Sequence, residues 1–246
     1  AGVATVWVAG SLMIQHVFGR DARVGVIGGV SGAFSNIMLV GLPFMISAYG
    51  QAAAVPVAAL IAVHLPVMMA ASTLHVQRAE RLDGATQGVP TSQLLLRVGG
   101  NLIRNPLIIG ILAGLAWHAT GIEIHGVFAT IIDMLTRAAV PTALFALGMS
   151  LARYGISGNV RPAVAVALLK LVLLPVCVYM LLTTLTDLPR LWIEVGTMAA
   201  ACPTGVNAWL IASRFGTGLA LSANVITLST AMAVVSMTLW LAFLTL

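Results

Sequence analysis

The amino-acid sequence predicts an all-α, polytopic membrane protein, and three observations support this fold class. Hydrophobic residues make up 60% of the 246 residues and charged residues only 8%, which is too apolar for a soluble globular domain. Apolar runs reach about 20 residues, the length that a helix needs to cross a bilayer. Apolar and polar residues do not alternate along these runs, so helices are favoured over the strands of a barrel.

Eight membrane-spanning helices are expected when charged and Pro/Gly-rich stretches are taken as the connections. Each expected helix is long enough to cross about 30 Å of hydrocarbon at about 1.5 Å per residue. The expected spans cover residues 1–19, 24–49, 53–76, 104–120, 126–152, 162–185, 191–214 and 217–246.

The arginines predict the orientation of these spans. Nine arginines lie in the first, third, fifth and seventh connections, against one, Arg190, in the other three. Because positively charged loop residues stay on the cytoplasmic side, the odd connections are expected in the cytoplasm. The protein is then expected in the inner (plasma) membrane of the cell, with its C-terminus outside. The nine arginines are Arg20, Arg23, Arg78, Arg81, Arg97, Arg104, Arg153, Arg161 and Arg214.

One long polar connection, residues 77–103, divides the chain. It separates a segment of three spans, 1–76, from a segment of five spans, 104–246. A cytoplasmic linker of this kind is typical of transporters built from two halves. The chain also starts inside an apolar run and without an initiator Met, so further upstream residues are expected in the native protein.

Several classes of function are not expected from this sequence. The net charge of +5 is spread singly over short connections, which does not favour nucleic-acid binding. Walker, G-x-S-x-G and zinc-protease motifs are absent, so neither an enzyme nor an ATP-driven pump is predicted. Cys177 and Cys202 lie in apolar runs and form no metal-binding pattern. No cofactor is expected, and the energy source would be a gradient of H⁺ or Na⁺.

The second and seventh spans contain residues that break helices. They read SNIMLVGLPFMISAYG over 35–50 and CPTGVNAWLIASRFG over 202–216. Proline removes a backbone donor and glycine lowers the cost of leaving helical dihedral angles, so local unwinding is predicted. The residues that mark the two breaks are Asn36, Gly41, Pro43, Pro203, Thr204, Gly205 and Asn207.

These breaks predict a binding site for an anion. Unwound backbone persists in a membrane only where it is packed in protein or lines a cavity. The half-helix after each break would direct its free N–H groups and positive dipole end at that cavity, which favours an anion. Asn36 and Asn207 would each be costly at this depth unless they are paired. The alternative is that both breaks are proline kinks that serve helix packing.

Five ordered motifs also resemble those of the auxin efflux carrier family, whose members include plant auxin carriers and bacterial permeases for malonate and related organic acids. The resemblance implies ten spans in two inverted repeats of five, of which the present eight would be the third to tenth. It further implies that the fourth and ninth spans of the family fold are unwound and cross to form the substrate site. The motifs are SNxxxxGLP in the second span, RNPLIIGILAGL at 104–115, PTALFALGMSLA at 141–152, LLKLVLLPV at 168–176 and ACPTGVNAWLIASRFG at 201–216.

Other polar residues within the spans have two interpretations each. Lys170 either reaches the cytoplasmic interface or forms a structural ion pair, or else it attracts the anion or couples transport. His64 is either a neutral histidine bonded to a backbone carbonyl or a proton site. Glu194 is either an interfacial residue or a proton-linked carboxylate. Asp133 and Arg137 are spaced to form an ion pair on one helix face, although Asp133 is also a candidate proton site.

Two G-x-x-x-G pairs predict close helix packing. Gly28 with Gly32, and Gly110 with Gly114, would let a neighbouring helix approach the backbone. The first interpretation is packing within one protomer, and the second is the interface of a homodimer.

Taken together, the sequence predicts a secondary active transporter, or permease, of small organic anions such as malonate. The carboxylate would accept hydrogen bonds from Asn36, Asn207, Thr204 and free backbone amides at the crossing, and the site would open alternately to each side. Two alternatives stay open at this point. One is a channel-like or sensory membrane protein that binds a small ligand at the same crossing, and the other is a non-functional truncated carrier.

Overall fold

The computed structural model describes residues 1–83, 100, 106–154, 156, 158 and 160–246. All named elements in these ranges are helical. The helices are α1 (Gly2–Leu12), α2 (Ala22–Ala33), α3 (Leu42–Tyr49), α4 (Ala54–Leu82), α6 (Pro106–Ala119), α7 (Gly126–Tyr154), α8 (Arg161–Leu168), α9 (Leu174–Leu185), α10 (Arg190–Ala201), α11 (Asn207–Arg214) and α12 (Leu219–Thr245). Short π-helical segments η1 (Met13–Val17), η2 (Ile37–Gly41) and η4 (Leu169–Leu173), and the 3-10 segment η3 (Gln51–Ala53), join some of them.

Within the described ranges, three continuous helices are long and apolar enough to cross a membrane. They are Gln51–Leu82, Arg161–Leu185 and Leu219–Thr245, and two shorter apolar helices cover Gly2–Val17 and Ile37–Tyr49. The chain is therefore an all-helical integral membrane protein, as predicted, whereas the number of eight spans stays a prediction. The second and seventh expected spans are each divided into two short helices, α2 with η2–α3 and α10 with α11.

One boundary of the expected division into segments differs from the structure. Helix α4 continues to Leu82, six residues beyond the expected end of the third span, so the start of the expected linker is helical. Most of the remaining linker, including Arg97, lies outside the described residues. The division into 1–76, 77–103 and 104–246 therefore stays a prediction.

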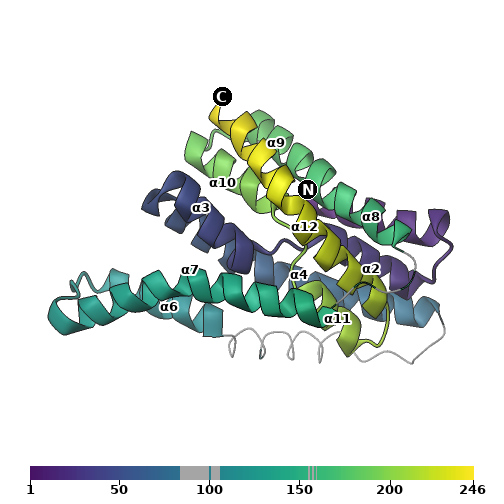
Figure 1. Ribbon diagram of the computed structural model, residues 1–246, viewed down its shortest axis with the longest axis horizontal. Coiled ribbons are helices and arrows are strands. Elements are labelled where there is room, and N and C mark those ends of the chain that lie inside the picture. The colour runs from purple at the N-terminus through teal and green to yellow at the C-terminus, as the bar shows by residue number, and fades with distance from the viewer. Residues whose placement is uncertain (84–99, 101–105, 155, 157, 159) are drawn as a thin grey trace.

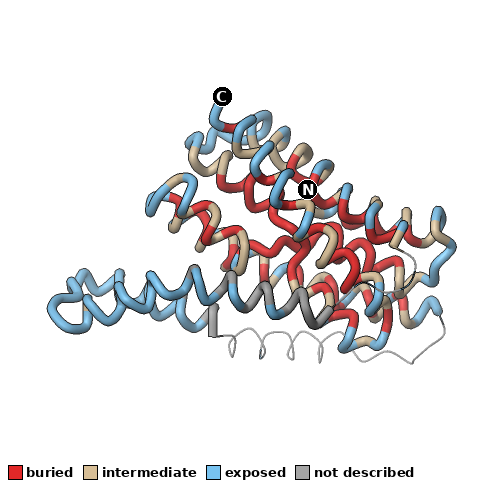
Figure 2. Tube along the Cα trace, in the orientation of Figure 1, coloured by how far each residue is buried: buried red, intermediate tan, exposed pale blue. Residues whose placement is uncertain are grey.

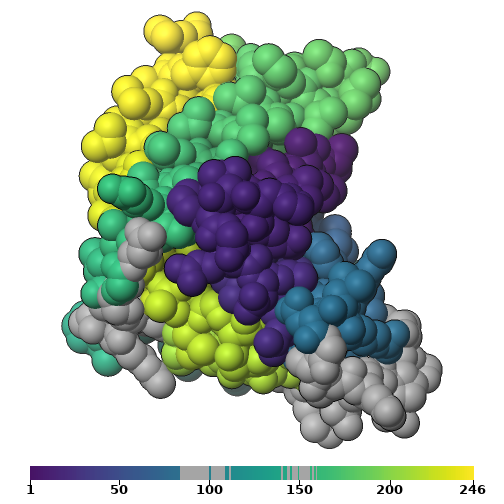
Figure 3. Space-filling view, turned by 90° about the vertical axis from the view of Figure 1, so that its right-hand side faces the viewer, coloured from purple at the N-terminus to yellow at the C-terminus, as the bar shows by residue number. Residues whose placement is uncertain are grey.

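The buried residues concentrate around α2, α10 and the chain between the half-helices, as Figure 2 shows. In the space-filling view of Figure 3, the N-terminal helices (purple) lie between α4 (blue) and the α8–α9 helix (green). Figure 1 shows α6 and α7 (teal) along one edge of this bundle, and α7 packs against η2 and α12. Almost all the described side chains of α6 and α7 are exposed.

Glycines allow α1 and α2 to pack closely. A Cβ atom at Gly10 would lie 3.2 Å from the Cα of Gly29, so the two backbones almost touch. Gly28 is packed beneath Ile14 of the same helix pair. The expected role of Gly28 in packing within the protomer is therefore confirmed.

The second G-x-x-x-G pair lies in a different environment. Among the described residues, no atom outside the surrounding backbone of the same helix lies within 4 Å of the position that a Cβ would take at Gly110 or at Gly114. The homodimer face expected at these glycines stays a prediction.

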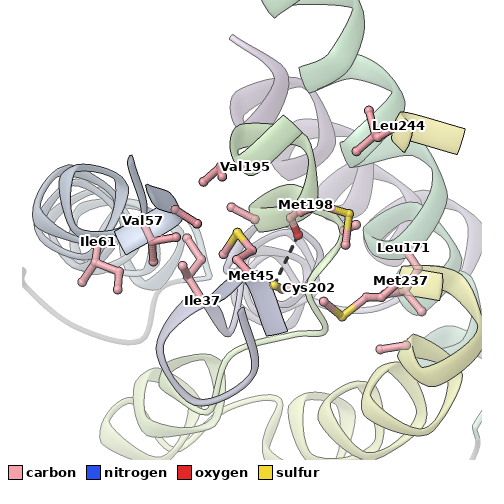
Figure 4. Packing of buried hydrophobic residues seen from close by; sticks show 14 residues of the cluster. Ile37, Met45, Val57, Ile61, Leu171, Val195, Met198, Cys202, Met237 and Leu244 are labelled. Atoms are coloured by element: carbon pink, nitrogen blue, oxygen red, sulfur yellow. Dashed lines mark hydrogen bonds between the residues drawn. The ribbon is translucent and has the colours of Figure 1, made fainter. Parts of the chain in front are cut away.

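An apolar cluster joins the first half-helix to the second half of the chain. Figure 4 shows Ile37 and Met45 of the η2–α3 segment packed with Met198 of α10 and with Cys202. The Cys202 thiol donates a hydrogen bond to the backbone oxygen of Met198, at 3.3 Å. This cluster holds the half-helix that follows the first break against the helix that precedes the second.

Candidate functional site

The two interrupted segments meet directly. Ser35 and Thr204 form an isolated antiparallel bridge. The Asn36 N–H donates to the Pro203 oxygen at 2.8 Å, and the Gly205 N–H donates to the Phe34 oxygen at 2.8 Å. Because unwound backbone in a membrane must find partners within the protein, each break satisfies polar groups that the other leaves free.

The first break does not lie where Gly41 and Pro43 suggested. The chain leaves the helix over Phe34–Asn36. Gly41 and Pro43 belong to the helical segment that follows. The π-helical turn η2 accommodates the proline, with the Gly41 N–H donating to the Asn36 oxygen at 3.1 Å. Pro43 lies in the first turn of α3, a position where proline is tolerated.

Gly41 has a packing role at this point. A Cβ atom there would lie 2.8 Å from the Cys202 sulfur, so glycine lets the half-helix approach the second break. The second break covers Cys202–Val206 and includes Pro203, Thr204 and Gly205 as expected, and Asn207 begins α11.

Thr204 ties the second break to its surroundings. Its side chain is fully buried, and its hydroxyl donates to the backbone oxygen of Ser31 at 2.7 Å. Its N–H donates to the Ser229 hydroxyl at 3.0 Å. The Thr204 hydroxyl proton is thus used within the protein, and this residue does not line the neighbouring cavity.

This arrangement gives a testable prediction for Thr204. Thr204→Val keeps the shape of the side chain but leaves the Ser31 oxygen without its donor, and should lower the free energy of unfolding by about 1–3 kcal/mol. Thermal unfolding in detergent measures the effect. Thr183→Val is the matched control, because the Thr183 hydroxyl is exposed and bonds only within its own helix. Equal melting temperatures for the two variants would contradict this role.

A cavity of about 180 Å³ opens beside the bridge. Of the residues singled out in the sequence, it brings together Asn36, Gly205, Asn207 and His64. Gly41, Pro43, Pro203, Thr204, Lys170 and Glu194 are not among the residues that line it. The described residues that line it are Phe34, Ser35, Asn36, Ile37, Met38, Leu39, Ile61, His64, Leu65, Gly205, Val206 and Asn207.

Asn36 carries an unused donor beside this cavity. The residue is 5% exposed, and its side-chain oxygen accepts from the Leu39 N–H at 3.3 Å. Its amide nitrogen is buried and has no hydrogen-bond partner within the described part of the chain. A buried polar group left without a partner costs about 1–3 kcal/mol, so the amide is suited to a ligand that accepts hydrogen bonds.

His64 contacts the first break, but as a hydrogen-bond acceptor and not as the expected donor. Its Nε2 accepts a long hydrogen bond of 3.4 Å from the Ser35 N–H, instead of donating to a backbone carbonyl. The ring also packs edge-on against Phe34, with centroids 5.4 Å apart. In a neutral histidine that accepts through Nε2, the proton lies on Nδ1.

Lys170 points inward, so the expectation that it reaches the membrane interface was wrong. The side chain is fully buried in the π-helical segment η4. Its ammonium donates to the Ser35 hydroxyl at 2.8 Å and to the Ala200 oxygen at 2.6 Å. The expected ion pair is not present either, because no ion pair among the described residues includes Lys170. One acceptor in the first break and one in the last turn of α10 hold the ammonium in place.

The two carboxylates that the sequence singled out, Glu194 and Asp133, do not line the cavity. Glu194 pairs with Arg190 at 2.6 Å, and Arg190 also donates to the Leu244 oxygen at 2.9 Å. Asp133 and Arg137 form the expected ion pair at 2.8 Å, and both side chains are exposed. None of the described residues that line the cavity is acidic.

Ser35 is the site residue that the sequence reasoning missed. It immediately precedes Asn36, so its place in the motif was visible. Its contact with Lys170 was not, because the two residues are 135 positions apart.

Comparisons with known proteins agree with a transport role. Residues 1–241 match the profile of a family described as "Membrane transport protein". A protein of Rhizobium meliloti (strain 1021) with the name "Putative malonate transporter" is 29% identical over 223 residues. The match covers 85% of this chain and 64% of that protein, so the chain spans about two thirds of its relative's length.

Proposed function

We propose, since this chain belongs to the membrane transport protein family, that it carries small organic anions such as malonate across the membrane. The observation that carries the proposal is the unpartnered amide nitrogen of Asn36 beside a cavity whose described lining contains no acidic residue. Such a cavity favours a ligand that is negatively charged and accepts hydrogen bonds. The name of the Rhizobium meliloti relative supports malonate as the first candidate.

The backbone around the cavity adds further donors. The η2 segment starts at Ile37 and α11 starts at Asn207, and both residues line the cavity. The first N–H groups of a helix lack acceptors within the helix, and the helix dipole places partial positive charge there. The N–H groups of Ala208 and Trp209 already donate to backbone oxygens just before α11, and the Leu39 N–H donates to Asn36. A carboxylate between the two helix starts would therefore accept from the N–H groups of Ile37 and Asn207, one from each half of the chain.

The size of the cavity favours a small substrate. Drug-sized ligands occupy pockets of about 300–1,000 Å³, and this cavity measures about 180 Å³. Its neutral donors fit a cargo that must bind and then leave. We propose that the two bridged segments move relative to their surroundings, so that the cavity opens alternately to each side of the membrane.

The driving force is also part of the proposal. Transport would be coupled to a gradient of H⁺ or Na⁺. Of the candidate proton sites, His64 lines the cavity, whereas Glu194 and Asp133 do not. A sodium ion would instead be held by backbone oxygens of the unwound segments.

The proposal is tested by uptake of labelled malonate into proteoliposomes that contain the full-length protein. Asn36→Ala is expected to lower the rate at limiting substrate by about 10-fold or more, because a hydrogen bond to a charged group contributes about 1.5–3 kcal/mol. Asn207→Ala should have a similar effect if its side chain faces the anion. Thr183→Val, which lies away from the cavity, should transport normally.

Two results would overturn this assignment. Unchanged saturable uptake by both asparagine variants would remove the crossing from the substrate site. Ion currents without saturable uptake by the unmodified protein would indicate a channel instead.

A further inference from the structure

Ser35 lies between the buried cation and the cavity. Its side chain is 6% exposed and lines the cavity next to Asn36. Its hydroxyl oxygen accepts the 2.8 Å hydrogen bond from the ammonium of Lys170. One residue of the first break thus contacts both the positive charge and the space proposed for the anion.

The direction of this hydrogen bond determines what Ser35 can do. An ammonium group only donates, so the Ser35 oxygen must accept, and its own hydrogen stays available for another acceptor. The hydrogen bonds of Ser35 with other described residues give its hydroxyl no acceptor. The hydroxyl hydrogen can therefore be donated into the cavity. Accepting from a cation also polarises a hydroxyl, which strengthens the hydrogen bond that it donates.

The charge on Lys170 lacks a counter-charge within the described protein. Its two acceptors, the Ser35 hydroxyl and the Ala200 oxygen, are both neutral. A fully buried cation without an anionic partner is costly, because desolvation is only partly offset by neutral acceptors. An anion bound in the neighbouring cavity would supply the missing negative charge.

We propose that Ser35 is a substrate-binding residue whose hydroxyl donates to the anion, and that Lys170 is a positioning residue that orients and polarises this hydroxyl. This inference rests on the proposed function and extends it to two residues. The substrate class is a small carboxylate. The cation stays one side chain behind the binding surface, so it attracts the anion without holding it in a direct ion pair.

The role of Lys170 also connects the two breaks. Its acceptors belong to the first break and to the last turn of α10, just before the second break. The helix that carries Lys170 widens into a π-helical turn at this position, a feature that often occurs at functional sites. Any movement that separates the breaks would therefore also change the contact that orients Ser35.

The experiment measures the dissociation constants of malonate and of malonamide, its neutral diamide, for the full-length protein by calorimetry. Ser35→Ala is expected to weaken malonate binding about 10-fold or more, and Ser35→Thr, which keeps the hydroxyl, should restore most of the affinity. Lys170→Met should weaken malonate binding by at least as much, with little effect on malonamide. Ser72→Ala is the matched control, because this buried hydroxyl bonds only within α4.

A double variant separates a direct contact from a general loss of structure. If Lys170 acts through Ser35, Ser35→Ala should weaken malonate binding much less in the Lys170→Met variant than it does in the unmodified protein. Equal losses for malonate and malonamide, or additive losses in the double variant, would overturn the proposal. Should Lys170→Met not fold, the comparison of Ser35→Ala with Ser35→Thr decides, and equal affinities for those two would overturn it.

The outcomes also distinguish this inference from the proposed function. If the unmodified protein binds no small carboxylate, the transport proposal fails with it. If the protein binds malonate but Ser35→Ala and Lys170→Met behave like Ser72→Ala, only the roles of Ser35 and Lys170 are wrong.

Discussion

Gly29→Ala is expected to lower the free energy of unfolding by about 3 kcal/mol, because overpacking a tight helix contact forces the backbone to move. A Cβ atom at this position would overlap the backbone oxygen of Trp7 and the hydroxyl of Ser11. The backbone oxygen cannot turn away as a flexible side chain could, so α1 and α2 would have to separate. This cost should exceed the gain of about 1 kcal/mol that alanine brings to a helix interior.

The same helix supplies the control for this prediction. At Gly32 a Cβ atom would meet its nearest neighbours, Val6 and Val166, at 3.5 and 3.6 Å, which is ordinary contact. Gly32→Ala should therefore leave the melting temperature in detergent unchanged or slightly raised, while Gly29→Ala lowers it by several degrees. If the two variants have the same melting temperature, the close contact between α1 and α2 is not important for stability.

Asn36→Asp is expected to have the largest effect on transport. It places a carboxylate in a cavity proposed to hold an anion, and removes the amide donor at the same time. Two like charges about 4 Å apart repel by about 4 kcal/mol at an effective dielectric constant of about 20, which corresponds to about a 1,000-fold loss of affinity. Uptake of malonate at limiting concentration measures this loss.

The comparison with Asn36→Ala isolates the charge. The alanine variant loses the donor and the acceptor of the Leu39 N–H but adds no charge, so it should retain roughly 10-fold to 100-fold more activity than the aspartate variant. Lowering the pH protonates the introduced carboxyl group, so the two variants should converge in acid relative to the unmodified protein measured at the same pH. Equal activity of the two variants at neutral pH would show that the cavity does not hold a negative charge.

The class of protein and the presence of two breaks could be predicted because both depend on local properties. Apolar composition excludes a soluble fold wherever the chain ends up, and Pro203 with Gly205 weakens the helix regardless of its neighbours. The same argument marked the first break by Asn36, Gly41 and Pro43, but of these only Asn36 lies in the unwound chain. A π-helical turn absorbed the proline, and the bridge to Thr204 determined that the backbone unwinds at Phe34–Asn36.

The direction of Lys170 shows why the rest of the site could not be predicted. Its position near the cytoplasmic end of a span suggested that its ammonium reaches the interface. The acceptors that draw it inward, Ser35 and Ala200, are 135 and 30 residues away along the chain. No local pattern contains such contacts, and so the sequence also gave no reason to single out Ser35.

The sequence by itself determined that this chain is a helical membrane protein with interruptions in its second and seventh apolar stretches. These features follow from hydrophobicity and from the backbone chemistry of proline and glycine, which act within a few residues. Only the tertiary structure decided that the two interruptions pair with each other, that the Asn36 amide stays unsatisfied in a cavity, and that Lys170 lies behind Ser35. Those features depend on packing between distant segments, because in a membrane every freed polar group must find its partner inside the fold.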